Sequence, residues 1–352
     1  MADGTLIEWT DATWNPITGC SVVSPGCTNC YAMRLAGTRL AHHKSRAGLT
    51  RDTKAGPVWT GEVRFNEQWL DQPLRWKKPR LIFVCAHGDL FAESVPDAWI
   101  DRVFAVMALA PHHTFQVLTK RSARMRAYMD YFSGADMHVD RVTAAMWKIS
   151  ERRTDHIHGG WPLRNVWLGV SVEDQKRADE RIPDLLATPA AIRWISAEPL
   201  LGPVDLMAIT NGSDGDRGGL NALTGIEMRT VWSGPPVAGL PSAKLDWVVV
   251  GGESGPGARP MHPDWARSLR DQCAAAGVAF HFKQWGEWAQ SVVERSGSGL
   301  YDNETFIHTD GRLNGNGGIR AGGVTMRRIG KVAAGRLLDG TEHNGWPQVP
   351  RG

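Results

Sequence analysis

Short apolar runs alternate with amphipathic segments along most of the chain. Six runs have the length and the β-branched or aromatic content of buried strands, at 81–85, 114–118, 166–170, 191–195, 245–250 and 278–282. Between several of them, apolar residues recur at helical spacing, at 96–110, 122–131, 174–186 and 263–276. Apolar strands that alternate with helices predict a parallel sheet covered by helices.

The 352 residues are enough for one large α/β barrel or two ordinary domains. We predict an α/β fold, with a partial or full parallel (β/α) barrel of TIM-like type at residues 1–290. Segments near 130–162 and 209–244 are predicted loop insertions. The Gly-rich residues 291–352 are a predicted C-terminal extension that packs on the barrel.

Each predicted strand is followed by polar or charged residues. In a parallel barrel the carboxyl ends of the strands share one face, and enzymes with this fold place their sites there. Helix N-caps account for part of this pattern, because Ser, Asp and Glu are frequent in the first turn. Glu198 precedes Pro199 and is not a helix cap, which favours a functional role. The other residues at strand ends include Asp89, Lys120, Ser171, Glu173, Glu253 and Lys283.

Composition narrows the class of protein. A hydrophobic content of 42% with 22% charged residues is ordinary for a globular protein and argues against a disordered chain. The net charge of +3 does not by itself indicate a nucleic-acid binder. No apolar run is long enough to span a membrane, and the first twenty residues lack the apolar core of a secretory signal. We therefore expect a cytoplasmic protein with reduced thiols.

Three of the five cysteines, Cys20, Cys27 and Cys30, lie within eleven residues with the spacing C-x6-C-x2-C. Residues 7–18 before them are compatible with a first strand, and residues 31–42 after them have a helical pattern. The cysteines therefore occupy the first βα loop, on the face of the other strand ends. Three thiolates in one loop can ligate a soft metal centre. An iron–sulfur cluster held by three cysteines leaves one iron open, whereas structural zinc sites have four ligands.

Two other interpretations of the three cysteines stay open at this point. A zinc site could be completed by His42, His43 or His87. The cysteines could also be reduced structural thiols. The remaining two, Cys85 and Cys273, are predicted to be small buried hydrophobic residues.

The sequence resembles the radical S-adenosylmethionine superfamily, and specifically a family of phage and prophage proteins within or beside it. The resemblance covers roughly residues 5–290, and Tyr31 matches the aromatic residue that follows the last cysteine. The first cysteine gap departs from the common C-x3-C-x2-C spacing of the superfamily. The matching stretches lie at 7–20, 27–32, 88–91, 118–121, 167–173, 196–200 and 251–255.

The resemblance implies that Cys20, Cys27 and Cys30 bind a [4Fe-4S] cluster whose open iron chelates S-adenosyl-L-methionine. An external electron donor of the flavodoxin or ferredoxin type would reduce the cluster, and cleavage of the cofactor would give a 5′-deoxyadenosyl radical that abstracts a hydrogen atom. The residues implied to bind this cofactor are Tyr31, Gly88, Asp89, Ser171 and Glu173. The residues predicted to contact the substrate, as catalytic residues, are Glu198, Glu253 and Lys120.

The phage association favours a nucleotide or a DNA base as substrate, for example in a rearrangement during thymine hypermodification in the host cytoplasm. Basic segments at 75–80, 120–126 and 326–331 could follow a phosphate backbone, although such segments are also common on solvated surfaces. One alternative is a repair enzyme that resembles DNA photoproduct lyases. Another is a zinc-stabilised nucleic-acid-binding protein without catalysis. A third is a metal-independent hydrolase that uses Glu198 and Glu253 as an acid–base pair.

Overall fold

A computed structural model describes residues 5, 7–131, 139–151, 157, 160–210, 219–229, 237–238, 243–291, 300–314 and 322–348. Seven strands form one sheet, in the order β1-β6-β7-β8-β9-β13-β14. The strand pairs β1–β6, β6–β7, β7–β8, β9–β13 and β13–β14 are all parallel. Helices lie in the connections between these strands, so the fold is α/β, as predicted. The parallel sheet is compatible with a partial (β/α) barrel.

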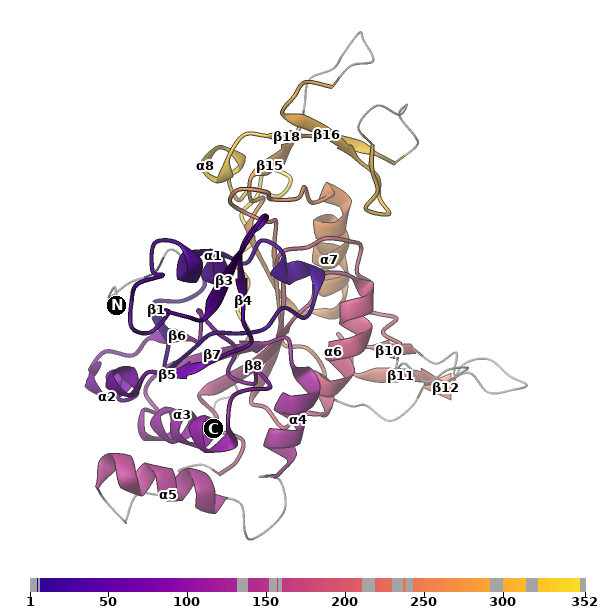
Figure 1. Cartoon of the computed structure of the whole chain (residues 1–352). Coiled ribbons are helices and arrows are strands. Elements are labelled where there is room, and N and C mark those ends of the chain that lie inside the picture. Colours follow the sequence, from indigo (N-terminus) through magenta and orange to yellow (C-terminus); the bar gives the residue numbers. More distant parts are fainter. Residues whose placement is uncertain are drawn as a thin grey trace. The chain divides into compact units, whose positions relative to one another are not determined.

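The chain divides into two compact units, residues 1–170 with 187–193, and residues 171–186 with 194–352. The sheet strands of the first unit are β1 (Ala12–Trp14), β6 (Leu81–Val84), β7 (Thr114–Thr119) and β8 (Val166–Ser171). Its helices are α1 (Tyr31–Gly37), α2 (Gln72–Arg75), α3 (Asp97–Leu109), α4 (Ser122–Tyr131) and α5 (Val139–Ser150), with 3₁₀ turns η1 (Pro25–Cys27) and η2 (Glu67–Trp69). Helices α3 and α5 lie side by side (Figure 1).

The second unit is built on β9 (Ile192–Ala197), β13 (Trp247–Gly251) and β14 (Ala279–Gln284). All five residues of β13 are buried, which fits its run of Trp, Val and Gly. Helix α7 (Pro263–Ala276) begins with proline in its first turn and ends at Gly277, whose φ of +65° gives the left-handed conformation of a helix C-cap. Helix α6 (Gln175–Ala187) follows β8 in the chain.

The predicted first strand, 7–18, is two short strands in the structure. β1 pairs with β6, whereas β2 (Ile17–Thr18) pairs antiparallel with β5 (Arg64–Phe65). Pro16 separates the two, and because proline has no N–H it cannot donate to a sheet. The predicted helix 31–42 ends earlier, at Gly37. The first unit also contains a β-hairpin of β3 (Thr50–Thr53) and β4 (Gly56–Trp59), which was not predicted.

The structure describes about half of the residues in the predicted insertions. Within them the structure describes α5 and a small antiparallel sheet of β10 (Gly219–Asn221), β11 (Ile226–Arg229) and β12 (Val237–Ala238). Most of the remaining residues of 130–162 and 209–244 are not described.

The C-terminal residues form a second antiparallel sheet that the sequence did not indicate. Its strands are β15 (Trp288–Gln290), β18 (Val324–Arg328), β16 (Glu304–Ile307) and β17 (Leu313–Asn314), in that order across the sheet, orange to yellow in Figure 1. The short helix α8 (Lys331–Ala334) follows β18.

The end of the chain then runs along the edge of β14. The amide of Phe282 donates to the His343 carbonyl, and the amide of Gly345 donates to the Phe280 carbonyl, both at 2.9 Å. The ring of Trp346 stacks on Trp247, with the ring centroids 5.0 Å apart. The predicted division of the chain near residue 290 stays a prediction. Within the described residues, no helix is both long enough and apolar enough to cross a membrane.

Candidate functional site

The loop that carries the cysteines begins at a close contact between two backbone segments. Gly19 forms a parallel bridge with Gly88, and its amide donates to the His87 carbonyl at 3.1 Å. Gly19 has a φ of +96°, and a Cβ atom there would lie 2.2 Å from the Glu62 carbonyl oxygen. Only glycine fits this position without rearrangement. The bridge therefore places Cys20, the next residue, beside the segment that follows β6.

Cys27 and Cys30 are held by tight turns in the same loop. Cys27 ends the 3₁₀ turn η1, and its amide donates to the Ser24 carbonyl at 2.9 Å. Cys30 is the N-cap residue of α1, and its amide donates to the Cys27 carbonyl at 3.3 Å. Cys20 and Cys30 pack against one apolar cluster, which consists of Ala32, Met33, Ala36, Leu49 and Trp59. The three predicted ligands thus lie in the turns that follow the first strand region, but their side chains do not form one metal-binding group in the described part of the chain.

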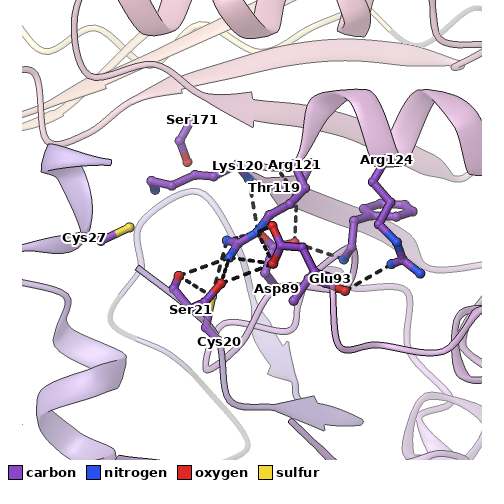
Figure 2. A network of polar contacts seen from close by, with 12 residues as sticks. Cys20, Ser21, Cys27, Asp89, Glu93, Thr119, Lys120, Arg121, Arg124 and Ser171 are labelled. Carbon is purple, nitrogen blue, oxygen red and sulfur yellow. Dashed lines mark hydrogen bonds and ion pairs between the residues drawn. The ribbon is translucent and has the colours of Figure 1, made fainter. Parts of the chain in front are cut away.

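The guanidinium group of Arg121 lies at the centre of a polar network beside Cys20 (Figure 2). Its Nη1 atom donates to the Cys20 sulfur at 3.4 Å and to Asp89 Oδ2 at 3.3 Å. Its Nε atom donates to Glu93 Oε1 at 3.1 Å, and Nη2 donates to the Ser21 carbonyl at 3.1 Å. The side chains of Arg121 and Asp89 are 5% and 7% exposed, so the contact between them is sheltered from water. Arg121 therefore connects a predicted metal ligand to two carboxylates.

The pKa of the Cys20 thiol is raised to about 12, first by burial and next by the Asp89 carboxylate, whereas Arg121 acts in the opposite direction. Cys27 and Cys30 also raise this pKa, because a negative charge on either disfavours one on Cys20. The three sulfurs therefore interact electrostatically. A thiol in this setting is protonated at neutral pH, and a metal would have to displace the proton.

Asp89 is buried, and both oxygens of its carboxylate accept hydrogen bonds from neighbouring residues. Oδ1 accepts from the Thr119 hydroxyl at 2.7 Å and from the Phe91 amide at 3.0 Å. Oδ2 accepts from the Lys120 amide at 3.1 Å, in addition to the Arg121 contact. Asp89 thus joins the end of β7 to the turn after β6. Its implied contact with the amine of a cofactor stays a prediction.

The other predicted residues of the first unit are more accessible. Tyr31 is 48% exposed, and its hydroxyl donates to the Ala86 carbonyl. The Lys120 side chain runs away from the Arg121 network (Figure 2). Gly88 is confined by backbone atoms of residues 17–19. Their roles in binding a cofactor or substrate stay predictions.

In the second unit, the predicted residues after β8 are buried. Glu173 has no exposed side-chain surface, and its Oε2 atom accepts from Arg181 Nη1 at 2.7 Å. The same Nη1 atom donates to the Ser171 carbonyl at 2.8 Å. Arg181 thus connects α6 to the segment after β8. Sequence reasoning missed this pairing, although Arg181 lies eight residues after Glu173 on the adjacent helix.

Glu198 lies at the centre of a second polar cluster in the second unit, together with residues from the end of β14. Lys283 Nζ lies 2.9 Å from both carboxylate oxygens, and Gln284 Nε2 donates to Oε1 at 2.9 Å. The Glu198 and Lys283 side chains are 18% and 13% exposed, which shields the pair from solvent only in part. A Cβ atom on Gly251 would lie 3.1 Å from Glu198 Cδ, so Gly251 leaves the space that this side chain occupies. The sequence places Lys283 at the end of a predicted strand, but it does not predict the pairing of Lys283 with Glu198.

Glu253, the other predicted catalytic carboxylate, is bound by Arg259. Arg259 contacts Glu253 through Nε, Nη2 and its backbone amide, at 2.6–2.8 Å. Glu253 is buried and belongs to the same unit as Glu198. In the structure both carboxylates are therefore ion-paired.

Two of the three histidines suggested for a zinc site, His43 and His87, contact other residues. His43 Nδ1 lies 2.6 Å from the Ser45 hydroxyl, and the His87 ring packs edge-on against Tyr31. Burial lowers the pKa of His87 to about 4. Across the described parts of the chain, no group of three or more His, Cys, Asp or Glu side chains is placed to hold a metal ion.

Comparisons with known proteins give one match. No curated protein and no solved structure matches the chain. The model of a family described as "Protein of unknown function (DUF5131)" matches residues 4–347, which is nearly the whole sequence. The chain therefore belongs to this family.

Proposed function

We propose that the protein is a radical S-adenosylmethionine enzyme in which Cys20, Cys27 and Cys30 hold a [4Fe-4S] cluster. The observation that carries the proposal is the placement of three thiols from one loop at the end of the first strand region of a parallel α/β fold. The sequence resemblance supports the same assignment.

The donor set fits such a cluster chemically. Three cysteines occupy three irons and leave the fourth open for a cofactor. When bound, the cluster and S-adenosyl-L-methionine supply a radical that abstracts a hydrogen atom. The chain's part would be to hold the three sulfurs, and the glycine bridge at Gly19 and the N-cap position of Cys30 would fix the backbone of the loop that carries them. The apolar cluster beneath Cys20 and Cys30 would exclude water from one side of the site.

Tyr31, proposed to face the cofactor, and Lys120, proposed to contact the substrate, are not enclosed by the protein. Tyr31 is exposed on α1, next to Cys30, and Lys120 is partly exposed. Asp89 and Glu173 are already bound by arginines. Their proposed contribution is therefore to position Arg121 beside the cysteine loop and Arg181 beside Ser171. Ser171 and Gly88 would contribute backbone groups next to these residues.

A nucleotide or DNA base remains the proposed substrate. Two of the three basic segments have their arginines paired with carboxylates, as in the pairs Arg124–Asp97 and Arg327–Glu304. In segment 75–80, Arg75 also pairs with a carboxylate, that of Asp71, but Lys77 and Lys78 are exposed and Arg80 stacks on the ring of Trp76, 4.7 Å from its centroid. Exposed cations beside an aromatic ring suit a phosphate-bearing ligand. This segment supports a nucleotide or DNA as the substrate class. The isomerase or lyase type of reaction is proposed from the sequence resemblance to the radical S-adenosylmethionine superfamily.

The test is an anaerobic preparation with ferrous iron and sulfide, compared with a Cys20→Ala/Cys27→Ala/Cys30→Ala variant. We expect about four irons per chain and a broad visible absorbance in the natural protein only. A Cys85→Ala/Cys273→Ala variant is the matched control, because both residues are buried hydrophobic positions, and it should retain iron. Cleavage of S-adenosyl-L-methionine by the reduced protein is the next assay.

Two results would contradict the proposal. One zinc per chain without colour would indicate a structural site. Iron bound equally by the triple variant would show that the cysteine loop is not the ligand.

A further inference from the structure

The sulfur of Cys20 differs from those of Cys27 and Cys30 in its surroundings. It accepts a hydrogen bond from the Arg121 guanidinium at 3.4 Å. Cys27 lies next to the Ser24 hydroxyl, at 3.9 Å. Such contacts matter, because hydrogen bonds and charges next to the ligands set the affinity and the reduction potential of a metal centre.

The charges around Cys20 oppose each other. One atom of Arg121, Nη1, lies 3.4 Å from the Cys20 sulfur and 3.3 Å from Asp89 Oδ2, so a single cation contacts both groups. Arg121 binds Asp89 and Glu93 with the same guanidinium that reaches the sulfur. Without Arg121, a buried carboxylate and a cysteine thiolate would lie together with no cation between them.

Hydrogen bonds fix both the backbone amide and the guanidinium group of Arg121. Its backbone amide donates to the Thr119 hydroxyl at 2.9 Å, and that hydroxyl donates to Asp89. Its Nη2 atom binds the Ser21 carbonyl, one residue after Cys20. The guanidinium group thus connects the cysteine loop to the ends of β6 and β7.

We propose that Arg121 is a positioning residue for the metal centre, which fixes Cys20 and, by separating its sulfur from Asp89, makes a bound cluster easier to reduce. This inference rests on the proposed function, since it concerns the cluster that Cys20 would hold. It assigns to Arg121 a role different from binding a substrate carboxylate or phosphate. The electrostatic reason is simple: reduction adds a negative charge, which a neighbouring cation favours and a neighbouring anion disfavours.

The experiment measures the midpoint potential and the rate of iron release to a chelator for the loaded protein and four variants. Arg121→Gln removes the hydrogen bond and the charge, and Arg121→Lys keeps the charge but not the planar fork. Glu93→Gln removes a carboxylate that is 60% exposed, and this change spares the buried part of the network. Arg124→Gln is the matched control: Arg124 lies one turn further along α4 and binds Asp97 instead.

We expect Arg121→Gln to lower the potential and to weaken iron retention about 10–100-fold, as outer-shell substitutions do. Arg121→Lys should change the potential little, because the charge is kept. It should weaken iron retention more, because the planar fork is lost. Glu93→Gln should raise the potential, and it remains informative if Arg121→Gln does not fold. Arg124→Gln should match the natural protein.

The inference is overturned if the natural protein loads iron but Arg121→Lys and Glu93→Gln leave the potential and iron release unchanged. A natural protein that takes up no iron would overturn the proposed function, and this inference with it. Because iron uptake is measured first, the two failures are distinguishable.

Discussion

A Cβ atom on Gly88 would lie 3.0 Å from the carbonyl oxygen of Gly19, the residue directly before Cys20. The Ile17 carbonyl would be 3.1 Å away and the Thr18 Cα atom 3.3 Å away. All three neighbours are backbone atoms, which cannot turn aside as a side chain can. The position of Cys20 therefore depends on the missing side chain of a residue that follows a different strand.

We predict that Gly88→Ala destabilises the protein by about 1–3 kcal/mol, the usual range for overpacking a tight contact. It should also reduce iron uptake, because the bridge that places Cys20 must open. Urea unfolding and iron analysis measure the two effects. Gly202→Ala is the control, since a Cβ atom there would lie 3.4 Å from Asp174 Cβ and 4.0 Å from Asp174 Cα, which are ordinary van der Waals distances. An unchanged midpoint and iron content in Gly88→Ala would show that the bridge does not hold the loop.

The sequence was sufficient to predict the main strands and the place of the cysteine loop. Buried parallel strands are continuous apolar runs, so 114–118 and 166–170 fall within one residue of β7 and β8. The cysteines follow the first strand region, as the pattern indicated. The first strand itself was too long in the prediction, because Pro16 redirects the chain into a second, antiparallel pair.

The partners of the charged strand-end residues could not be predicted. Arg121 and Cys20 are 101 residues apart in the sequence, and their contact depends on the order of the strands. Lys283 and Glu198 are likewise joined only by the fold. The C-terminal antiparallel sheet was missed for another reason: its strands are two to five residues long and separated by Gly-rich stretches, so alternation is too weak to detect.

Lys283 and Glu198 should be energetically coupled. Lys283→Met leaves a largely buried carboxylate with only Gln284 as a side-chain donor, and we expect a loss of about 2–3 kcal/mol in the free energy of unfolding. Glu198→Gln in the same protein should recover part of this loss, because it removes the uncompensated charge. A double-mutant cycle by urea unfolding measures the coupling, expected at about 1–3 kcal/mol. Additive effects would show that solvent, rather than Lys283, compensates Glu198.

His281 should make the protein less stable as the pH falls. It is 2% exposed on β14, and neither ring nitrogen has a partner among the described residues. Burial, with Arg336 and Lys283 nearby, lowers its pKa from 6.5 to about 4. Below pH 6.5 the unfolded chain binds a proton that the folded protein does not, so stability is lost between pH 6.5 and 4, by roughly 3 kcal/mol.

His281→Phe should remove this part of the pH dependence and be neutral or stabilising at pH 7, because it replaces a buried ring with no hydrogen-bond partner. Unfolding in urea across pH 4–7 measures the slope. The exposed His42→Phe is the matched control and should keep the slope of the natural protein. An unchanged slope in His281→Phe would mean that the ring is already protonated or hydrated when folded.

Asp339 should anchor the end of the chain to α7. Its carboxylate binds Arg267 Nη2 at 2.8 Å and Arg270 Nη1 at 2.6 Å, and hydrogen bonds from these two arginines lower the pKa of Asp339 to about 2. The stabilisation is therefore present above the ordinary aspartate pKa near 3.8 and is lost as the pH falls toward 2. Because the Asp339 side chain is 38% exposed, we expect only about 0.5–1 kcal/mol.

Asp339→Asn is the sharpest test of this anchor. Asp339 has a φ of +53°, a conformation that asparagine also tolerates, so the variant removes charge without adding backbone strain. At pH 7 we expect faster hydrogen exchange at residues 335–346, which bind β14 through the Gly345 amide and the His343 carbonyl, and little change at β13, which is paired on both sides. Asp310→Asn, which breaks an exposed pair with Arg312, is the control and should leave this exchange unaltered. Equal exchange in both variants would place the anchor in the backbone bonds to β14 and the stacking of Trp346 on Trp247, because these contacts remain when the ion pair is gone.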